Sequence, residues 1–173
     1  MKTRSLSTYR RAPWGPLVLD TSDDRIESQV PGSARVVIEC PAAHAMADPP
    51  VLALLFEGVN VLFDDEHRAT LRQPRRSSSH RSDRSILVEG DASFVPPGLH
   101  LRARWLGSMG LEMSRADGGA EDRRLVRPRF DLLNAPFLFG ATFSVPAIDA
   151  TLSPDLIALW GAAEWHLISA VHV

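Results

Sequence analysis

Basic side chains alternate with apolar ones between Leu99 and Trp105, in a run suited to binding an anion. His100, Arg102 and Arg104 occupy every second position, with leucine or alanine between them. Successive side chains of a β-strand point to opposite faces, so these three would share one face. An arginine guanidinium can bind a carboxylate through two parallel hydrogen bonds. The spacing therefore predicts a strand with one face capable of holding an anionic ligand.

The orientation of this strand leaves two alternatives open. In the first, the apolar residues face the core and the basic residues face solvent, which is the default for a half-buried strand. In the second, the basic residues line a barrel lumen, where an anionic ligand would compensate their buried charge. The apolar set is Leu99, Leu101, Ala103 and Trp105. The candidate ligand-binding residues are His100, Arg102, Arg104 and Trp105.

Motifs for enzymatic chemistry are absent from the sequence. It contains no G-x-S-x-G nucleophile elbow, no P-loop and no G-x-G-x-x-G phosphate-binding turn. None of the six histidines has the spacing of a metal site, and Cys40, the only cysteine, reads as a buried structural thiol. We therefore expect no catalytic residue, no metal and no cofactor. An enzyme would need scattered groups to converge, such as His100 with Glu112 and a third group.

Length and charge restrict the class of protein. The chain has 173 residues, which suits one domain with its own core, and its net charge of −2 does not favour binding nucleic acid as a whole. The basic N-terminal segment lacks the apolar stretch of a secretory signal, and no apolar run approaches the length of a membrane span. These features predict a cytoplasmic protein.

Short apolar runs separated by Gly, Pro, Asp and Ser occupy the first two thirds of the chain, which indicates a small β-sandwich or barrel. The arginine-rich stretch 67–85 interrupts them. Its serine and proline content favours a solvated loop, and the alternative is a patch that contacts phosphates.

A helix is predicted near the end of the chain. Ser153 is a suitable N-cap, Pro154 suits the first helical position, and Asp155 lies in the first turn. Apolar residues then recur at helical spacing, which predicts an amphipathic helix. Packing in the core is the default interpretation of its apolar residues, and its width is also suited to a helix shared between the core and a partner subunit. The predicted dimerisation residues are Leu156, Leu159, Trp160, Ala163 and Leu167.

Three stretches together resemble a known family. "GDASFVPPGLHLRARW" (90–105), "RRLVRPRFDLLNAPFLFG" (123–140) and "SPDLIALWGAAEWHLISAVHV" (153–173) resemble the N-terminal domains of AraC/XylS-type transcription regulators. The resemblance covers about residues 50–173. It implies a mostly β fold with C-terminal α-helices, in which a cupin-like double-stranded β-helix forms a small barrel followed by a helical dimerisation segment.

The resemblance also implies a division of the chain and a function. Residues 1–30 would form an N-terminal arm or first strand, 31–115 the barrel, and 116–173 a linker and helices. The chain would be the effector-sensing and dimerisation domain of a bacterial AraC-type regulator, a homodimer without the helix-turn-helix units that read DNA. Of the metal-binding cupin motifs, only the step from Pro97 to His100 is present. The alternative is a stand-alone cupin-fold enzyme, of isomerase or oxygenase type.

Overall fold

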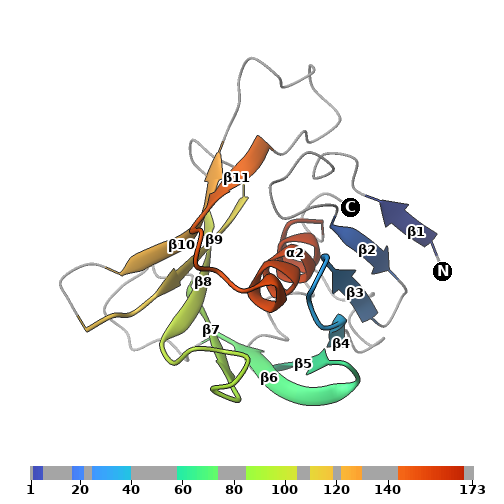
Figure 1. Cartoon of the computed structure of the whole chain (residues 1–173), viewed down its shortest axis with the longest axis horizontal. Coiled ribbons are helices and arrows are strands. Elements are labelled where there is room, and N and C mark those ends of the chain that lie inside the picture. The colour runs from blue at the N-terminus through green and yellow to red at the C-terminus, as the bar shows by residue number, and fades with distance from the viewer. Residues whose placement is uncertain are drawn as a thin grey trace.

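A single antiparallel sheet organises the described part of the chain. The computed structural model describes residues 2–5, 17–21, 25–39, 58–73, 85–104, 110–118, 122–129 and 144–169. Within these ranges, eleven strands pair in the order in which they occur in the sequence (Figure 1). The strands are β1 (Lys2–Ser5), β2 (Val18–Thr21), β3 (Arg25–Gln29), β4 (Val36–Glu39), β5 (Val59–Phe63), β6 (Glu66–Arg72), β7 (Ser85–Gly90), β8 (Leu99–Arg104), β9 (Gly110–Arg115), β10 (Arg123–Arg129) and β11 (Ser144–Ile148).

The strand order corrects one expectation about the fold. The mostly β class with a C-terminal helix is confirmed. A double-stranded β-helix, however, is built from Greek keys, in which strands that are distant in sequence lie side by side. Here each strand pairs with its neighbours in the chain, which makes the sheet a meander. The cupin-like order is therefore not the order of the described strands.

The sheet extends across the predicted domain boundaries. β2 and β3 lie within 1–30 and pair directly with the strands that follow. β10 and β11 lie in the region 116–173, where only a linker and helices were expected. The Arg-rich stretch was also expected to begin as a loop at residue 67, but Glu66–Arg72 is strand β6, and residues 74–84 lie outside the described residues.

Helix α2 (Pro154–Ser169) lies against the inner, concave side of the curved sheet, in contact with β3, β4 and β9 (Figure 1). Its start agrees with the prediction. The Ser153 hydroxyl accepts a hydrogen bond from the backbone N–H of Leu156 at 3.3 Å, which caps the first turn. The Asp155 carboxylate accepts another from the backbone N–H of Ala34 at 2.7 Å. This bond ties the first turn to the tight turn between β3 and β4.

The middle of α2 is buried on all sides, so the prediction of an amphipathic helix is wrong. Every residue from Leu156 to Glu164 is buried. A helix that is apolar around its whole circumference belongs inside a core, not at its surface. Inward residues of the sheet surround it, and the Trp160 indole N–H donates to the backbone carbonyl of Leu111 at 2.7 Å.

Four of the predicted dimerisation residues belong to this core. Leu156 is 5% exposed, and Leu159, Trp160 and Ala163 are fully buried within the single chain. The side chain of Leu167 is not among those that the structure describes. Dimerisation through α2 remains a prediction, and a dimer that preserved this core would use other residues. Among the described residues, no helix is long and apolar enough to cross a lipid bilayer.

Gly161 allows α2 to approach the segment before β2 closely. A Cβ atom at this position would lie 2.7 Å from Cδ2 of Leu17, which is itself buried. We expect Gly161→Ala to be destabilising, because overpacking costs about 1–3 kcal/mol and the gain in helix propensity recovers only about 1 kcal/mol. In a Leu17→Ala background the same change should be tolerated. Urea denaturation should give a coupling of about 0.5–3 kcal/mol between the two positions.

The matched control for this cycle pairs Gly161→Ala with Val88→Ala. Val88 is buried on β7, whereas the main strand contacts of α2 are with β3, β4 and β9. This pair should be additive. If Gly161→Ala costs the same in the Leu17→Ala, Val88→Ala and wild-type backgrounds, the close approach at Leu17 is not what requires glycine.

Candidate functional site

Strand β8 separates its apolar and basic residues between the two faces of the sheet. Leu99 and Leu101 are 1% and 0% exposed and point into the core around α2. His100 and Arg102 alternate with them and therefore lie on the opposite, outer face, partly exposed. The alternative in which the basic residues line a lumen is wrong for His100 and Arg102. The side chain of Arg104 and the whole of Trp105 lie outside the described residues.

The pairing of β8, β9 and β10 brings further polar residues to the same outer face. His100 lies opposite Ser114, and Arg102 lies opposite Glu112. Ser114 in turn lies opposite Arg124 of β10. These five residues are called the outer-face cluster: His100, Arg102, Glu112, Ser114 and Arg124.

Glu112 is the buried member of the outer-face cluster. It is only 7% exposed, and neighbouring Ser114 is 3% exposed. The Ser114 hydroxyl donates to Glu112 Oε1 at 3.4 Å, and Nε of Arg124 lies 3.9 Å from the same oxygen. Arg102 is its cross-strand neighbour on the other side. A carboxylate at this depth requires nearby positive charge and hydrogen bonds, which these residues supply.

Sequence reasoning did not include Ser114 or Arg124 in the site. The alternation in 110–115 carried part of the signal, because Leu111 and Met113 are apolar and Glu112 and Ser114 are polar. That pattern shows which residues share a face. It does not show which residue of the next strand lies opposite, because the register across β8, β9 and β10 depends on the whole sheet.

His100 is held at both ring nitrogens. Nδ1 lies 3.3 Å from the carbonyl oxygen of Gly98, and Nε2 lies 3.2 Å from a carboxylate oxygen of Asp122. Both partners are hydrogen-bond acceptors. Ser114 is the cross-strand neighbour of His100, but its hydroxyl is directed to Glu112. Ser114, His100 and Asp122 therefore lack the serine-to-histidine hydrogen bond of a catalytic triad.

The enzyme alternative required His100, Glu112 and a third group to converge. His100 and Glu112 do share the outer face, but each lies opposite a different residue, Ser114 and Arg102 respectively. In the part of the chain that the structure describes, no three His, Cys, Asp or Glu side chains gather closely enough to hold a metal ion. The cluster is thus arranged for ionic contacts and hydrogen bonds.

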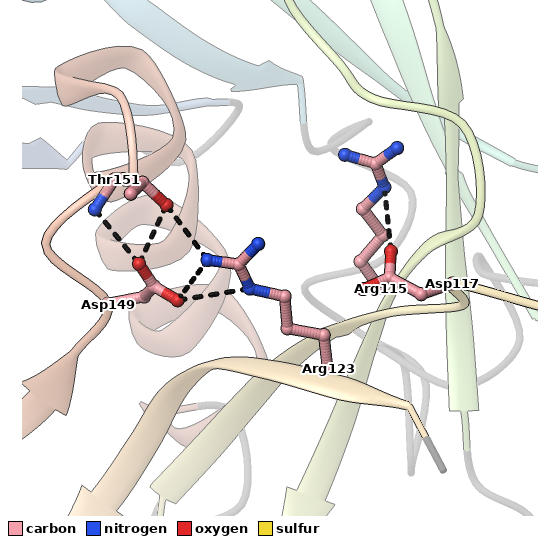
Figure 2. Close-up of polar contacts among 5 residues, drawn as sticks. All are labelled: Arg115, Asp117, Arg123, Asp149 and Thr151. Carbon is pink, nitrogen blue, oxygen red and sulfur yellow. Dashed lines mark hydrogen bonds and ion pairs between the residues drawn. The ribbon is translucent and has the colours of Figure 1, made fainter. Parts of the chain in front are cut away.

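A second polar group lies on the α2 side of the same strands, and we call it the latch: Arg123, Asp149 and Thr151. Figure 2 shows the Arg123 guanidinium turned toward Asp149, in the segment that leads into α2. Nε and Nη2 of Arg123 lie 3.2 and 2.7 Å from Asp149 Oδ2. The Thr151 hydroxyl and backbone N–H both donate to Asp149 Oδ1, at 2.7 and 2.9 Å. The latch thus joins the first residue of β10 to the segment that precedes α2.

Like charges meet next to the latch. Arg115 and Arg123 lie directly opposite each other on β9 and β10. Opposed like charges destabilise a strand pair. Asp149 compensates Arg123, and Asp117, 3.4 Å from Nε of Arg115, compensates the other arginine (Figure 2). Both arginines are accordingly paired with acids.

Comparisons of the chain with models of known families, with curated proteins and with solved structures found no match. The resemblance to AraC/XylS-type sensor domains therefore stays a prediction from the sequence.

The latch makes a prediction about acid stability. Hydrogen bonds from Thr151 and Arg123 hold the pKa of Asp149 well below its usual range. A carboxyl whose pKa is lowered by folding stabilises the folded state above its unfolded pKa of about 3.9, and this stabilisation is lost as the pH falls toward the folded pKa. We expect Asp149→Asn to lower the thermal midpoint at pH 7. The difference in thermal midpoint between Asp149→Asn and wild type should become smaller as the pH falls from about 4 to about 2.

Glu89→Gln serves as the control for this measurement, because Glu89 is an exposed carboxylate on β7. Its thermal midpoint should follow that of wild type across the same pH range. A difference between Asp149→Asn and wild type that stays constant down to pH 2 would contradict the assigned role of the carboxylate.

Proposed function

We propose that this chain is a non-enzymatic binding module that recognises a small anionic molecule on the outer face of β8, β9 and β10. One observation carries the proposal: the sheet register gathers His100, Arg102 and Arg124 on one face around a single buried carboxylate, Glu112. A guanidinium group that is partly exposed can bind a ligand carboxylate through two parallel N–H donors.

Exposed arginines on this face are suited to an anionic ligand. Arg72 of β6 lies in the same cross-strand row as His100, with Leu87 of β7 between them, and it is exposed. Arg124 is about half exposed, and its only ion pair among the described residues is the 3.9 Å contact with Glu112. That distance is too long for a hydrogen bond, so this contact uses none of the Arg124 donors.

The proposed site lies on the outer face of the sheet and not in a barrel lumen. The inner side of the sheet is occupied by α2 and by apolar residues such as Leu101, Leu111 and Met113. The outer face is the side on which His100 and Arg102 are accessible. The regulatory part of the proposal, in which the chain acts as the sensor domain of a bacterial AraC-type regulator, rests on the sequence resemblance.

Citrate is a suitable probe, because it carries several carboxylates and its binding can be measured by titration calorimetry at constant ionic strength. We expect wild type to bind citrate and Arg102→Gln/Arg124→Gln to bind it at least about tenfold more weakly. Each lost charged hydrogen bond costs about 1.5–3 kcal/mol. Arg124→Gln alone should weaken binding less and leave the fold intact, because its side chain is 47% exposed.

Arg25→Gln is the matched control. Arg25 lies on β3, distant in the strand order from the outer-face cluster, and its side chain is 48% exposed. It should bind citrate as wild type does. Equal citrate affinity in wild type and in the Arg102→Gln/Arg124→Gln variant would refute the site. Native mass spectrometry of the purified chain would also report the number of subunits and the mass of any retained small molecule.

A further inference from the structure

Two consecutive arginines of β10 serve opposite faces of the sheet. Arg124 lies opposite Ser114 and belongs to the outer-face cluster. Arg123 lies opposite Arg115 and turns toward Asp149 on the α2 side (Figure 2). A ligand bound at Arg124 is therefore one residue away from the contact that holds the segment leading into α2.

The backbone at this point is not a regular ladder. The pairing of β10 with β9 shifts between Arg124 and Val126, so Leu125 falls in a β-bulge. A bulge leaves one residue without a regular pairing partner and changes the local twist of the strand. The Leu125 carbonyl instead accepts the backbone N–H of Asp149 at 2.8 Å. The irregular part of β10 is thus bonded to the segment before α2 through both backbone and side chain.

Two sets of polar contacts hold the segment before α2 and the first turn of the helix. The latch holds residues 149–151 to β10, and the Leu152 N–H continues the turn by donating to the Asp149 carbonyl at 3.0 Å. On the other side, Asp155 accepts the N–H of Ala34. The buried stretch that begins at Leu156 is held by apolar packing. The segment 149–155 is accordingly held by polar contacts at both ends, with Leu152 packed against the edge of the core.

We propose that the latch couples the outer-face site to the first turn of α2, so that an anion bound at Arg102 and Arg124 orders residues 149–155. This inference rests on the proposed function of the outer face. A ligand that holds Arg124 in one orientation restricts the twist of the bulged strand, and that twist sets the position of Arg123. Coupling of this kind is reciprocal, so an intact latch must also strengthen ligand binding.

The direction in which Asp149→Asn changes citrate affinity distinguishes the coupling from a simple charge effect. Asp149→Asn removes a negative charge, which by itself would strengthen the binding of an anion. The coupling predicts the opposite, because the latch is lost. We expect citrate to bind Asp149→Asn about fivefold or more weakly than wild type, the lower end of typical coupling between sites. Thr151→Ala, which removes a hydroxyl donor and no charge, should weaken binding in the same direction.

The test combines calorimetry with hydrogen exchange on the full chain. Citrate should slow amide exchange in residues 149–157 of wild type and leave it unchanged in Asp149→Asn. Arg25→Gln is the matched control, because it breaks an ion pair with Glu27 at an arginine whose exposure, 48%, is close to the 49% of Arg123. It should bind citrate as wild type does and retain the slowed exchange.

The outcomes distinguish the coupling from the site itself. Weaker binding by Asp149→Asn and Thr151→Ala, with slowed exchange in wild type, supports the coupling. If wild type binds citrate through Arg102 and Arg124 and both latch variants bind it equally well, the coupling is overturned and the outer-face site stands. If wild type binds no citrate, both proposals fail together.

Discussion

The burial of α2 against the concave side of the sheet is the constraint on which the rest of the structure depends. The helix is buried on every side from Leu156 to Glu164, and Trp160 donates to the Leu111 carbonyl in its midst. An indole N–H at that depth needs a partner, because an unsatisfied buried donor costs about 1–3 kcal/mol. The inner side is occupied in this way, and His100, Arg102 and Arg124 lie on the opposite, outer face.

Strands β8, β9 and β10 therefore have two functions. Their inward residues, such as Leu101 and Met113, pack in the core that surrounds α2. Their outward residues gather cations around Glu112, which is buried although it lies on the outer face. Neighbouring strands lie only about 4.8 Å apart. Each outward side chain thus meets those of both adjacent strands, and short-range ionic contacts are built from residues distant in sequence.

Two carboxylates, one just before α2 and one in its first turn, hold the start of the helix to two parts of the sheet. Asp149 joins the segment before the helix to Arg123 of β10, and Asp155 joins the first turn to the turn between β3 and β4. An acid in the first turn also stabilises the helix through its dipole. These two carboxylate contacts lie at the helix start, and apolar packing surrounds its middle.

Local patterns in the sequence determined the elements, and the tertiary structure decided their partners. The alternation in 99–105 predicted a strand and favoured, without deciding, the orientation with Leu99 and Leu101 inward that the structure shows. The cap at Ser153 predicted the helix start, because capping depends on neighbouring residues. Only the tertiary structure showed that the whole circumference of the helix is buried and that the strands pair in meander order. The same holds for the pairing of Arg123 with Asp149, which lie 26 residues apart in the sequence. Sheet register and ion pairs between distant segments depend on packing of the entire chain, which no local pattern encodes.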